Sequence, residues 1–600
     1  MKRNIWIKTL LLLLSFCLGL GYYYFIDLKP IDIKHPYSTA GAFSFNVDAK
    51  TAHTAKLQIA AGNFKLKRIE CAGKKIFFPY KKVQWFRDIA EEGTFPLKKG
   101  SNVCRVEVYN FHRPYTPVVK QKITYFDYTL LFILMGIPLY TLLFYLLTGG
   151  LDLLRKKKNP AAPASVEKRA SAVQTFPKWI LGILLAGALI RVLYFHKFGV
   201  MLFQHDWQGH IEFIKYISAH WSLPLPSKGL EYPQQPLYYL ITGGIDTLLT
   251  RFGLAQKDVW FGIGYFSLLC SFVFLYYSYR FMALMTQNEW VRGIAMIFVS
   301  LTPSLVYMSA RINNDVLVMA LSAFSLYYVV KSYHSGFGKD FYTALLGVSL
   351  LFMTKISTVP MEVLLFILLI VAYAGAGERE RKQTGRALYL FGVTGLFLLG
   401  MTLLRVYMPA EGILHMVNSS GHYPGQSITA LGADYFGTFH FGTLFEAGCS
   451  HVFGQDPIRF SFLTYQYGTM FFGEFDYSYF LNKSTWLHPV MQAVLLLGLL
   501  FVLGFAGYIV RLYRASLLDK LLFATLLLNL LLILKFMFDY PSVCNTDFRY
   551  FVPSFLLLAY VFSKGLEPLL SIKHIGNLLR GWIVLLAGSE IFFFILLITG

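Results

Sequence analysis

The chain has 600 residues, of which 56% are hydrophobic, 17% are aromatic and only 15% are charged. This composition excludes an ordinary soluble protein, because many apolar runs reach the roughly 20 residues that a membrane-spanning helix needs. The net charge of +22 does not indicate nucleic-acid binding, since the sequence holds no basic motif with base-reading residues and cytoplasmic loops of membrane proteins collect Lys and Arg. We therefore predict an all-α polytopic membrane protein.

The N-terminal quarter predicts two membrane helices that flank a small extracytoplasmic domain. Residues 1–26 have a basic start and an apolar run that ends in Tyr and Phe, which is typical of a retained signal anchor. Residues 27–126 are polar with alternating stretches, which predict a β-sandwich inserted after the first helix. Residues 127–149 predict the second transmembrane helix, and residues 150–176 a basic, Pro/Ala-rich cytoplasmic linker. Two roles stay open for the sandwich, a structural lid and a sugar-binding module.

Residues 177–600 predict the main membrane domain. With its short basic loops placed in the cytoplasm, the apolar runs give eleven further spans, about thirteen in the whole chain. Large outer loops then fall at 197–258 and 408–485. The apolar stretch Leu237–Leu249 lies within the first outer loop and is too short to span, so it predicts an interfacial or re-entrant helix. The sequence shows no internal inverted repeat, which argues against a secondary transporter.

Polar and charged residues gather near the outer ends of the predicted spans, whereas the span centres are mostly apolar. Asp206 directly follows an apolar span, and ionisable residues at membrane depth are functional candidates. A transporter usually places such acids near the bilayer midplane, whereas an enzyme that faces one side gathers them at one rim. The rim residues are Asp206, Glu231, Asn313, Asn314, Asp315, Lys355, Arg405 and Arg549.

The rim residues predict a group transfer from a phosphate-containing substrate. A carboxylate such as Asp206 can take a proton from an attacking hydroxyl. Cations such as Lys355, Arg405 and Arg549 can hold a phosphate leaving group, and aromatic rings suit the apolar faces of sugars and isoprenoid tails. The residues expected to shape the substrate pocket are His205, Trp207, His210, Glu231, Tyr232, Tyr238 and Asn314.

Several of these residues also have a structural interpretation. Asp206 can cap the helix that follows it, and Asn314-Asp315 can cap another. His210 lies on the same helical face as Asp206, so the two can chelate a metal, or His210 can be a structural histidine. Lys355 can mark a hairpin tip, and Arg549 can extend to the membrane interface.

Five short motifs lie at the outer ends of the predicted spans, and their order is more specific than any one of them. Each joins an acid or a cation to aromatic residues, prolines or amides. In chain order they are Asp206, the phrase Tyr232-Pro-x-x-Pro-Leu-Tyr-Tyr239, Thr302-Pro303 followed by Arg311–Asp315, Lys355 within Met353–Ser357, and Arg549-Tyr550 before Pro553.

Over residues 177–565, this order resembles the GT-C superfamily of membrane glycosyltransferases, in particular the branch with protein O-mannosyltransferases and the lipid A aminoarabinose transferase. Such enzymes transfer a sugar from a polyprenyl-phosphate carrier, with inversion, to an acceptor outside the cytoplasm. The resemblance implies a GT-C-like fold, Asp206 as the catalytic base, Asp315 as a second acidic site, and Lys355 and Arg549 at the donor phosphate. The sequence lacks the WWDYG-type signature of oligosaccharyltransferases, which argues against block transfer to Asn.

The sequence therefore predicts an inverting transferase that moves a monosaccharide from an undecaprenyl-phosphate-type donor to a lipid, glycan or protein. Its expected place is the bacterial cytoplasmic (inner) membrane, with the active site facing the periplasm or exterior. A lipid-linked saccharide polymerase or ligase and a transporter or flippase are the alternatives, and a need for a divalent metal stays open. Glu474 and Asp476 can contact the acceptor. Two disulfides, Cys71–Cys104 and Cys449–Cys544, would fit an oxidising compartment.

Overall fold

The computed structural model describes two groups of residues. The first is the set of strands between residues 31 and 121, and the second comprises residues 177–402, 432–442, 461–539 and 543–599, apart from positions 201, 204–205, 225, 227–228 and 476. The chain divides into two compact units, and each is described by itself. The first unit contains residues 1–158, 224–233 and 392–417, and the second contains residues 159–223, 234–391 and 418–600.

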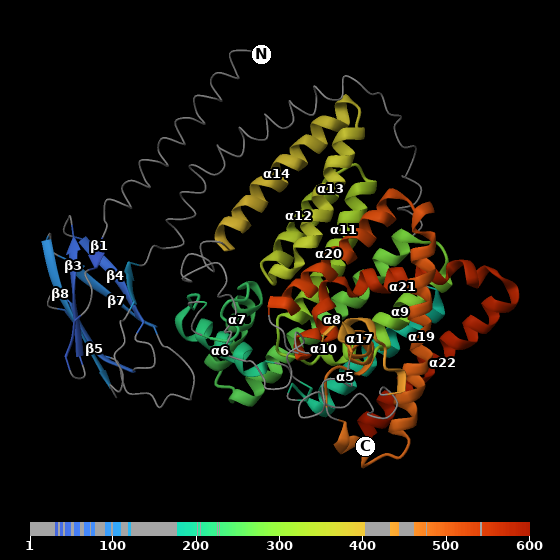
Figure 1. Ribbon diagram of the computed structural model, residues 1–600, viewed down its shortest axis with the longest axis horizontal. Coiled ribbons are helices and arrows are strands. Elements are labelled where there is room, and N and C mark those ends of the chain that lie inside the picture. Colours follow the sequence, from blue (N-terminus) through green and yellow to red (C-terminus); the bar gives the residue numbers. More distant parts are fainter. Residues whose placement is uncertain are drawn as a thin grey trace. The chain divides into compact units, whose positions relative to one another are not determined.

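The described part of the first unit holds two antiparallel sheets (Figure 1). One follows the order β1-β3-β8-β5-β6 with β2 added to β3, and the other follows the order β7-β4-β9. The strands agree with the β structure predicted for residues 27–126, while their packing into a sandwich stays a prediction. The strands are β1 (Ile31–Ile33), β2 (Tyr37–Thr39), β3 (Ala42–Ala49), β4 (His53–Ala60), β5 (Lys65–Cys71), β6 (Lys74–Phe77), β7 (Ala90–Leu97), β8 (Gly100–Tyr109) and β9 (Val118–Gln121).

One cysteine of the first sheet is in a disulfide. Cys71, the last residue of β5, is buried and disulfide-bonded. The residue opposite it in the register of β5 and β8 is Cys104, the partner expected from the sequence. The other expected pair includes Cys449, which lies outside the described residues.

Within the described residues, eight helical segments are long and apolar enough to cross a membrane, as expected for a multi-pass membrane protein. They fall in the helices α5 (Lys178–Phe198), α8 (Gln256–Met285), α11 (Asp315–His334), α13 (Val359–Gly375), α14 (Glu378–Thr402), α19 (Leu487–Arg511), α20 (Leu517–Asp539) and α22 (Lys573–Thr599).

Three shorter helices lie between these segments in the chain. They are α9 (Glu289–Leu301), α12 (Lys339–Phe352) and α21 (Phe555–Ser571), with 13, 14 and 17 residues. The segments predicted for 1–26 and 127–149 lie outside the described residues, so the count of thirteen spans stays a prediction.

The first predicted outer loop holds two short helices, α6 (Trp207–His220) and α7 (Leu237–Arg251). Both form where the sequence predicts a helix, and α7 has only 15 residues, too few to cross a bilayer. The helices pack closely, because Gly243 of α7 leaves room for the side chain of Ile217 of α6. The loop therefore contains two packed helices, and Asp206 directly precedes the first of them.

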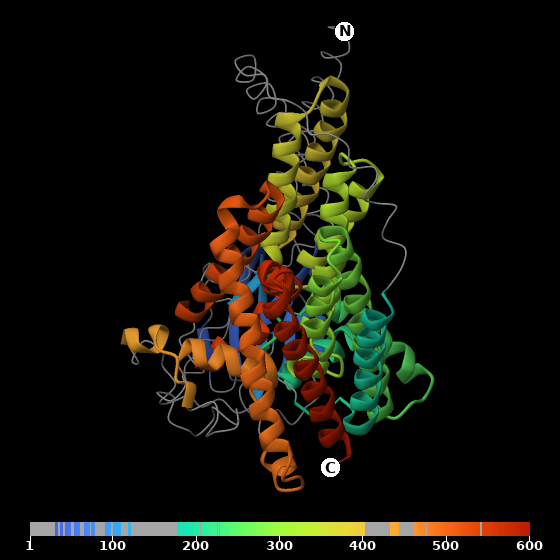
Figure 2. The ribbon, with the colours of Figure 1, turned by 90° about the vertical axis from the view of Figure 1, so that its right-hand side faces the viewer.

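Helices that pack against one another in pairs build the core of the second unit. Helix α11 packs between α8 and α12, and α19 packs against α21 (Figure 1). Helix α22 runs alongside α19 towards the C-terminal end of the chain (Figure 2). These packed helices carry the connections that the sequence predicts on the outer side of the membrane, called the outer connections.

A proline ends α9 and directs the chain towards the outer connections. Pro303 has no N–H, so the carbonyl of Val299 loses its usual helical donor. The guanidinium of Arg191, fully buried in α5, fills this gap by donating to the oxygens of Val299 at 2.9 Å and Ser300 at 2.5 Å. Glu590 of α22 accepts a bond from Thr302 at 3.4 Å. The short helix α10 (Pro303–Met308) then leads to the connection before Asp315.

The crossing of α19 and α21 gives a stability prediction. A Cβ on Gly565 would clash with the carbonyl oxygen of Gly504, because the two backbones touch at this point. We expect Gly565→Ala to lower the free energy of unfolding by about 1–3 kcal/mol, the usual cost of overpacking, measured by thermal unfolding in detergent. Gly588→Ala is the matched control, because a Cβ there meets nothing within 4 Å. Equal unfolding temperatures for the two variants would contradict the prediction.

Candidate functional site

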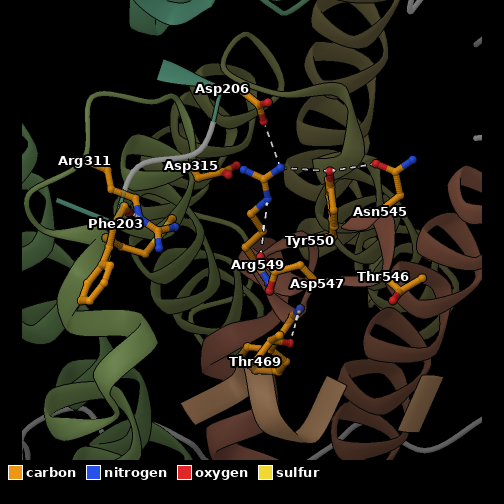
Figure 3. A network of polar contacts seen from close by, with 12 residues as sticks. Phe203, Asp206, Arg311, Asp315, Thr469, Asn545, Thr546, Asp547, Arg549 and Tyr550 are labelled. Carbon is orange, nitrogen blue, oxygen red and sulfur yellow. Dashed lines mark hydrogen bonds and ion pairs between the residues drawn. The ribbon is translucent and has the colours of Figure 1, made fainter. Parts of the chain in front are cut away.

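The side chain of Asp206 pairs with Arg549 across the outer connections. Asp206 occupies the N-cap position of α6 with a left-handed backbone (φ 51°), a conformation that Asp tolerates better than most residues. Its carboxylate makes no cap hydrogen bond and instead accepts one from Nη2 of Arg549 at 2.9 Å (Figure 3). The capping interpretation is therefore wrong, and the Asp206 side chain, 42% exposed, is held by a charge 343 positions away.

Arg549 is also held by Asp547, which lies two residues earlier in the chain. Asp547 caps the 3-10 helix η9 (Phe548–Ser554), because its Oδ1 accepts the backbone N–H of Arg549 at 3.2 Å. Its Oδ2 lies 3.7 Å from Nε of Arg549, and Nη2 also donates to the hydroxyl of Tyr550 at 3.2 Å. Figure 3 shows the guanidinium among the carboxyl groups of Asp206, Asp315 and Asp547. Arg549 is thus part of a polar network rather than only an interfacial anchor.

A second ion pair lies beside the first. Nζ of Lys355 is 2.5 Å from Oδ1 of Asp315, and both side chains are largely buried. The pair joins the start of α11 to the connection between α12 and α13, and Nζ lies 5.9 Å from the centre of the Tyr550 ring. Asn314 does not cap α11 with its side chain, since its amide donates to Gln234 and to the carbonyl of Thr354. Lys355 therefore has an electrostatic role beyond marking a hairpin tip.

His210 is close enough to Asp206 and Asp315 to feel their charges and is neutral at physiological pH. It is buried, and its Nδ1 is hydrogen-bonded to the hydroxyl of Tyr239 at 2.8 Å. Burial lowers the pKa of His210 to about 4, although the charges of Asp206 and Asp315 oppose the shift. A neutral imidazole in contact with a tyrosine fits a structural histidine. Within the part of the chain that the structure describes, no group of three or more His, Cys, Asp or Glu residues could hold a metal ion.

The charges around Arg549 shift the pKa values of its neighbours in opposite directions. Burial raises the pKa of Asp206, but the charge of Arg549, its hydrogen bond to Asp206 and the other nearby charges together outweigh this effect, so the net pKa lies below the ordinary value. Burial and the charge of Asp547 raise the pKa of Glu474 to about 8, and burial raises that of Asp547. The negative charge of Asp547 thus favours the protonated form of Glu474.

A small cavity lies beside Arg549, which is one of its lining residues. It is about large enough for one water molecule. Arg311 lines it, donating from Nε to the carbonyl of Phe203 at 2.9 Å and stacking on the ring of Phe475. Asp547 was not among the residues predicted from the sequence. The feature that could have pointed to it is its capping position, two residues before Arg549. The other residues around the cavity are Ser304, Met308, Thr469, Gly473, Asp547, Phe548, Arg549 and Phe555.

The remaining residues that were predicted to shape the substrate pocket lie in different parts of the structure. Trp207 packs edge-on against Trp260, with ring centroids 4.8 Å apart, beside the start of α6. Tyr238 is fully buried against Tyr239 and Phe266, because it lies on the face of α7 that packs on α8. His205 and Arg405, like Asp476, lie outside the described residues. Glu231 and Tyr232 belong to the first unit, so their relation to Arg549 stays a prediction.

Comparisons with known proteins add little to this geometry. No protein-family model matches the chain, and no curated protein matches it. One similar solved structure is the cryo-EM structure of the arabinosyltransferase EmbB from Mycobacterium smegmatis, with 10% sequence identity and a TM-score of 0.39 over 94% of this chain and 53% of EmbB. The chain thus spans about half the length of EmbB. A TM-score this low does not establish a shared fold, so the function has to be argued from the site itself.

The lowered pKa of His210 predicts a pH-dependent stability. The folded pKa of about 4 lies below the ordinary 6.5, so the stabilisation is complete above pH 6.5 and declines as the pH falls towards 4. Between pH 6.5 and 5 we expect a loss of about 2 kcal/mol, seen as a lower unfolding temperature. His210→Gln should remove most of this dependence, whereas His220→Gln, at the exposed end of the same helix, should keep it. Identical pH profiles for all three proteins would refute the assignment.

The Lys355–Asp315 pair predicts a non-additive double mutant. Lys355→Met leaves the buried carboxylate of Asp315 uncompensated, which costs about 3 kcal/mol. Adding Asp315→Asn removes that charge, so the double variant should be more stable than Lys355→Met alone. Thermal unfolding of the three variants gives the coupling energy. The half-exposed pair Lys331–Asp340 is the control, with Lys331→Met expected to cost less than about 1 kcal/mol. Additive effects at Lys355 and Asp315 would contradict a coupled pair.

Proposed function

We propose that this protein is a membrane glycosyltransferase of the GT-C type, which moves a single sugar from a polyprenyl-phosphate donor to an acceptor outside the cytoplasm. The observation that carries the proposal is the pairing of Asp206, an accessible carboxylate, with Arg549 beside the Asp315–Lys355 pair. A base for a hydroxyl and cations for a phosphate are the two parts that such a transfer needs.

The chemistry follows from these groups. Asp206 takes the proton of the acceptor hydroxyl as its oxygen attacks the anomeric carbon of the sugar. The bond between that carbon and the phosphate oxygen breaks, and its electron pair remains on the phosphate. Arg549 and Lys355 stabilise the charge that develops there. Attack from the side opposite the phosphate inverts the anomeric centre. Asp315 orients Lys355 through their ion pair.

The position of these side chains along the chain supports a site on one side of the membrane. They come from the connections α5–α6, α10–α11, α12–α13 and α20–α21, which the distribution of Lys and Arg assigns to the outer side. The proposal therefore includes a bacterial cytoplasmic membrane, a site that faces the periplasm or exterior, and a donor of the undecaprenyl-phosphate type. The relation to the branch of O-mannosyltransferases and aminoarabinose transferases is part of the same proposal.

A lipid-linked sugar transfer assay tests the proposal. Asp206→Asn should lower the turnover rate by at least about 100-fold, the usual contribution of a general base. Arg549→Gln should also abolish most activity, because the leaving phosphate loses its bidentate partner. Asp340→Asn, at the opposite turn, is the control that should retain the wild-type rate.

Two outcomes would count against this function. Full activity of Asp206→Asn would remove the carboxylate from the reaction. Products that carry oligosaccharide blocks rather than single sugars would replace the proposal by a polymerase or ligase, and mass spectrometry of the acceptor distinguishes the two.

A further inference from the structure

Arg549 is held by two carboxylates of unequal accessibility. The side chain of Asp547 is 2% exposed and also accepts the backbone N–H of Arg549, so this contact is built into η9. The side chain of Asp206 is 42% exposed and contacts only the outer end of the guanidinium. The inner carboxylate therefore fixes Arg549, whereas the outer one can leave for water at low cost.

The donor groups of the guanidinium are divided between these partners. Nε faces Asp547, and Nη2 donates to Asp206 and to the hydroxyl of Tyr550. Among the described residues, Nη1 donates no hydrogen bond to a side chain or backbone group. A phosphate binds a guanidinium best through two parallel N–H groups. Because Nε faces Asp547, the pair left for such a contact is Nη1 with Nη2, and Asp206 already occupies Nη2.

The charges favour the same conclusion. Arg311, Lys355 and Arg549 face the carboxylates of Asp206, Asp315 and Asp547, so the site is close to neutral as it stands. A phosphodiester adds one negative charge, which is costly unless a carboxylate moves away. Asp315 and Asp547 are both largely buried, which leaves Asp206 as the group that can move.

We propose that the donor phosphate displaces Asp206 from Arg549, so that binding of the donor itself frees the catalytic base. This inference rests on the proposed function and specifies the order of its events. In the exchange one ion pair breaks and another forms, and no proton or covalent bond changes. Before donor binding the carboxylate is neutralised by Arg549 and accepts a proton poorly. After donor binding it faces the acceptor hydroxyl, while Asp547 keeps Arg549 at the phosphate.

The experiment measures the affinity of the full-length protein for farnesyl phosphate, a sugar-free isoprenyl phosphate, in nanodiscs of zwitterionic lipid. If Asp206 and phosphate compete, Asp206→Asn should bind the probe about twofold to fivefold more tightly than wild type, the range for loss of a partly exposed ion pair. Arg549→Gln should bind it more weakly than wild type. Asp340→Asn, which breaks an ion pair of another turn, should bind it as wild type does.

Kinetics provide an independent measure. The residual activity of Asp206→Asn should show a lower KM for the donor together with a lower kcat, a combination that a merely structural role of Asp206 would not produce. Asparagine tolerates the left-handed backbone of this position, so the fold should persist. Asp206→Gly, which suits a φ of 51° even better, is the second variant for the same measurements.

The possible results separate the two proposals. If wild type transfers sugar but neither Asp206 variant gains affinity for the probe, the exchange is refuted and the transferase stands. If wild type neither binds the probe nor transfers sugar, the proposed function falls, and the exchange falls with it. Tighter binding by the Asp206 variants together with lost transfer supports both.

Discussion

The ion pair between Asp206 and Arg549 is the contact on which the arrangement of the site depends. It joins the residue before α6 to η9, across 343 positions of the chain, and the guanidinium that it binds also contacts Tyr550 and Asp547. A charged group is stable in such a poorly solvated place only when it is paired and hydrogen-bonded. The pairing therefore explains why the connection before α6 approaches the connection before α21.

The requirement that buried polar groups find hydrogen-bond partners also shapes the helix bundle around Pro303. Pro303 removes a helical donor at the end of α9, and Arg191 supplies the missing hydrogen bonds to the carbonyls of Val299 and Ser300. The chain can then turn through α10 and present Arg311 and Asp315 at the outer connections. The helix break at Pro303 thus depends on Arg191, and it places Asp315 where it can form the second ion pair of the site.

The sequence predicts most of the helical framework, because apolar runs and basic loops depend on local composition. It also selected Asp206, Asp315, Lys355 and Arg549, since charged residues beside apolar runs stand out. It did not predict how these four pair, because each partner lies on a distant segment and many pairings fit the same pattern. It missed Asp547, whose capping role is visible only with Arg549, and it did not predict the full burial of Tyr238, since burial against α8 depends on the orientation of α7.

The pairing has a consequence for how such a site can work. A carboxylate with a pKa lowered by Arg549 is a weak proton acceptor, and a guanidinium already bound to carboxylates is a weak phosphate ligand. In the structure described here, each group therefore inactivates the other. One event, the arrival of an anion at Arg549, removes both obstacles, because it occupies the cation and releases the base together. A transporter has no need for such mutual inactivation, whereas an enzyme gains a base that becomes free only when the group to be transferred is in place.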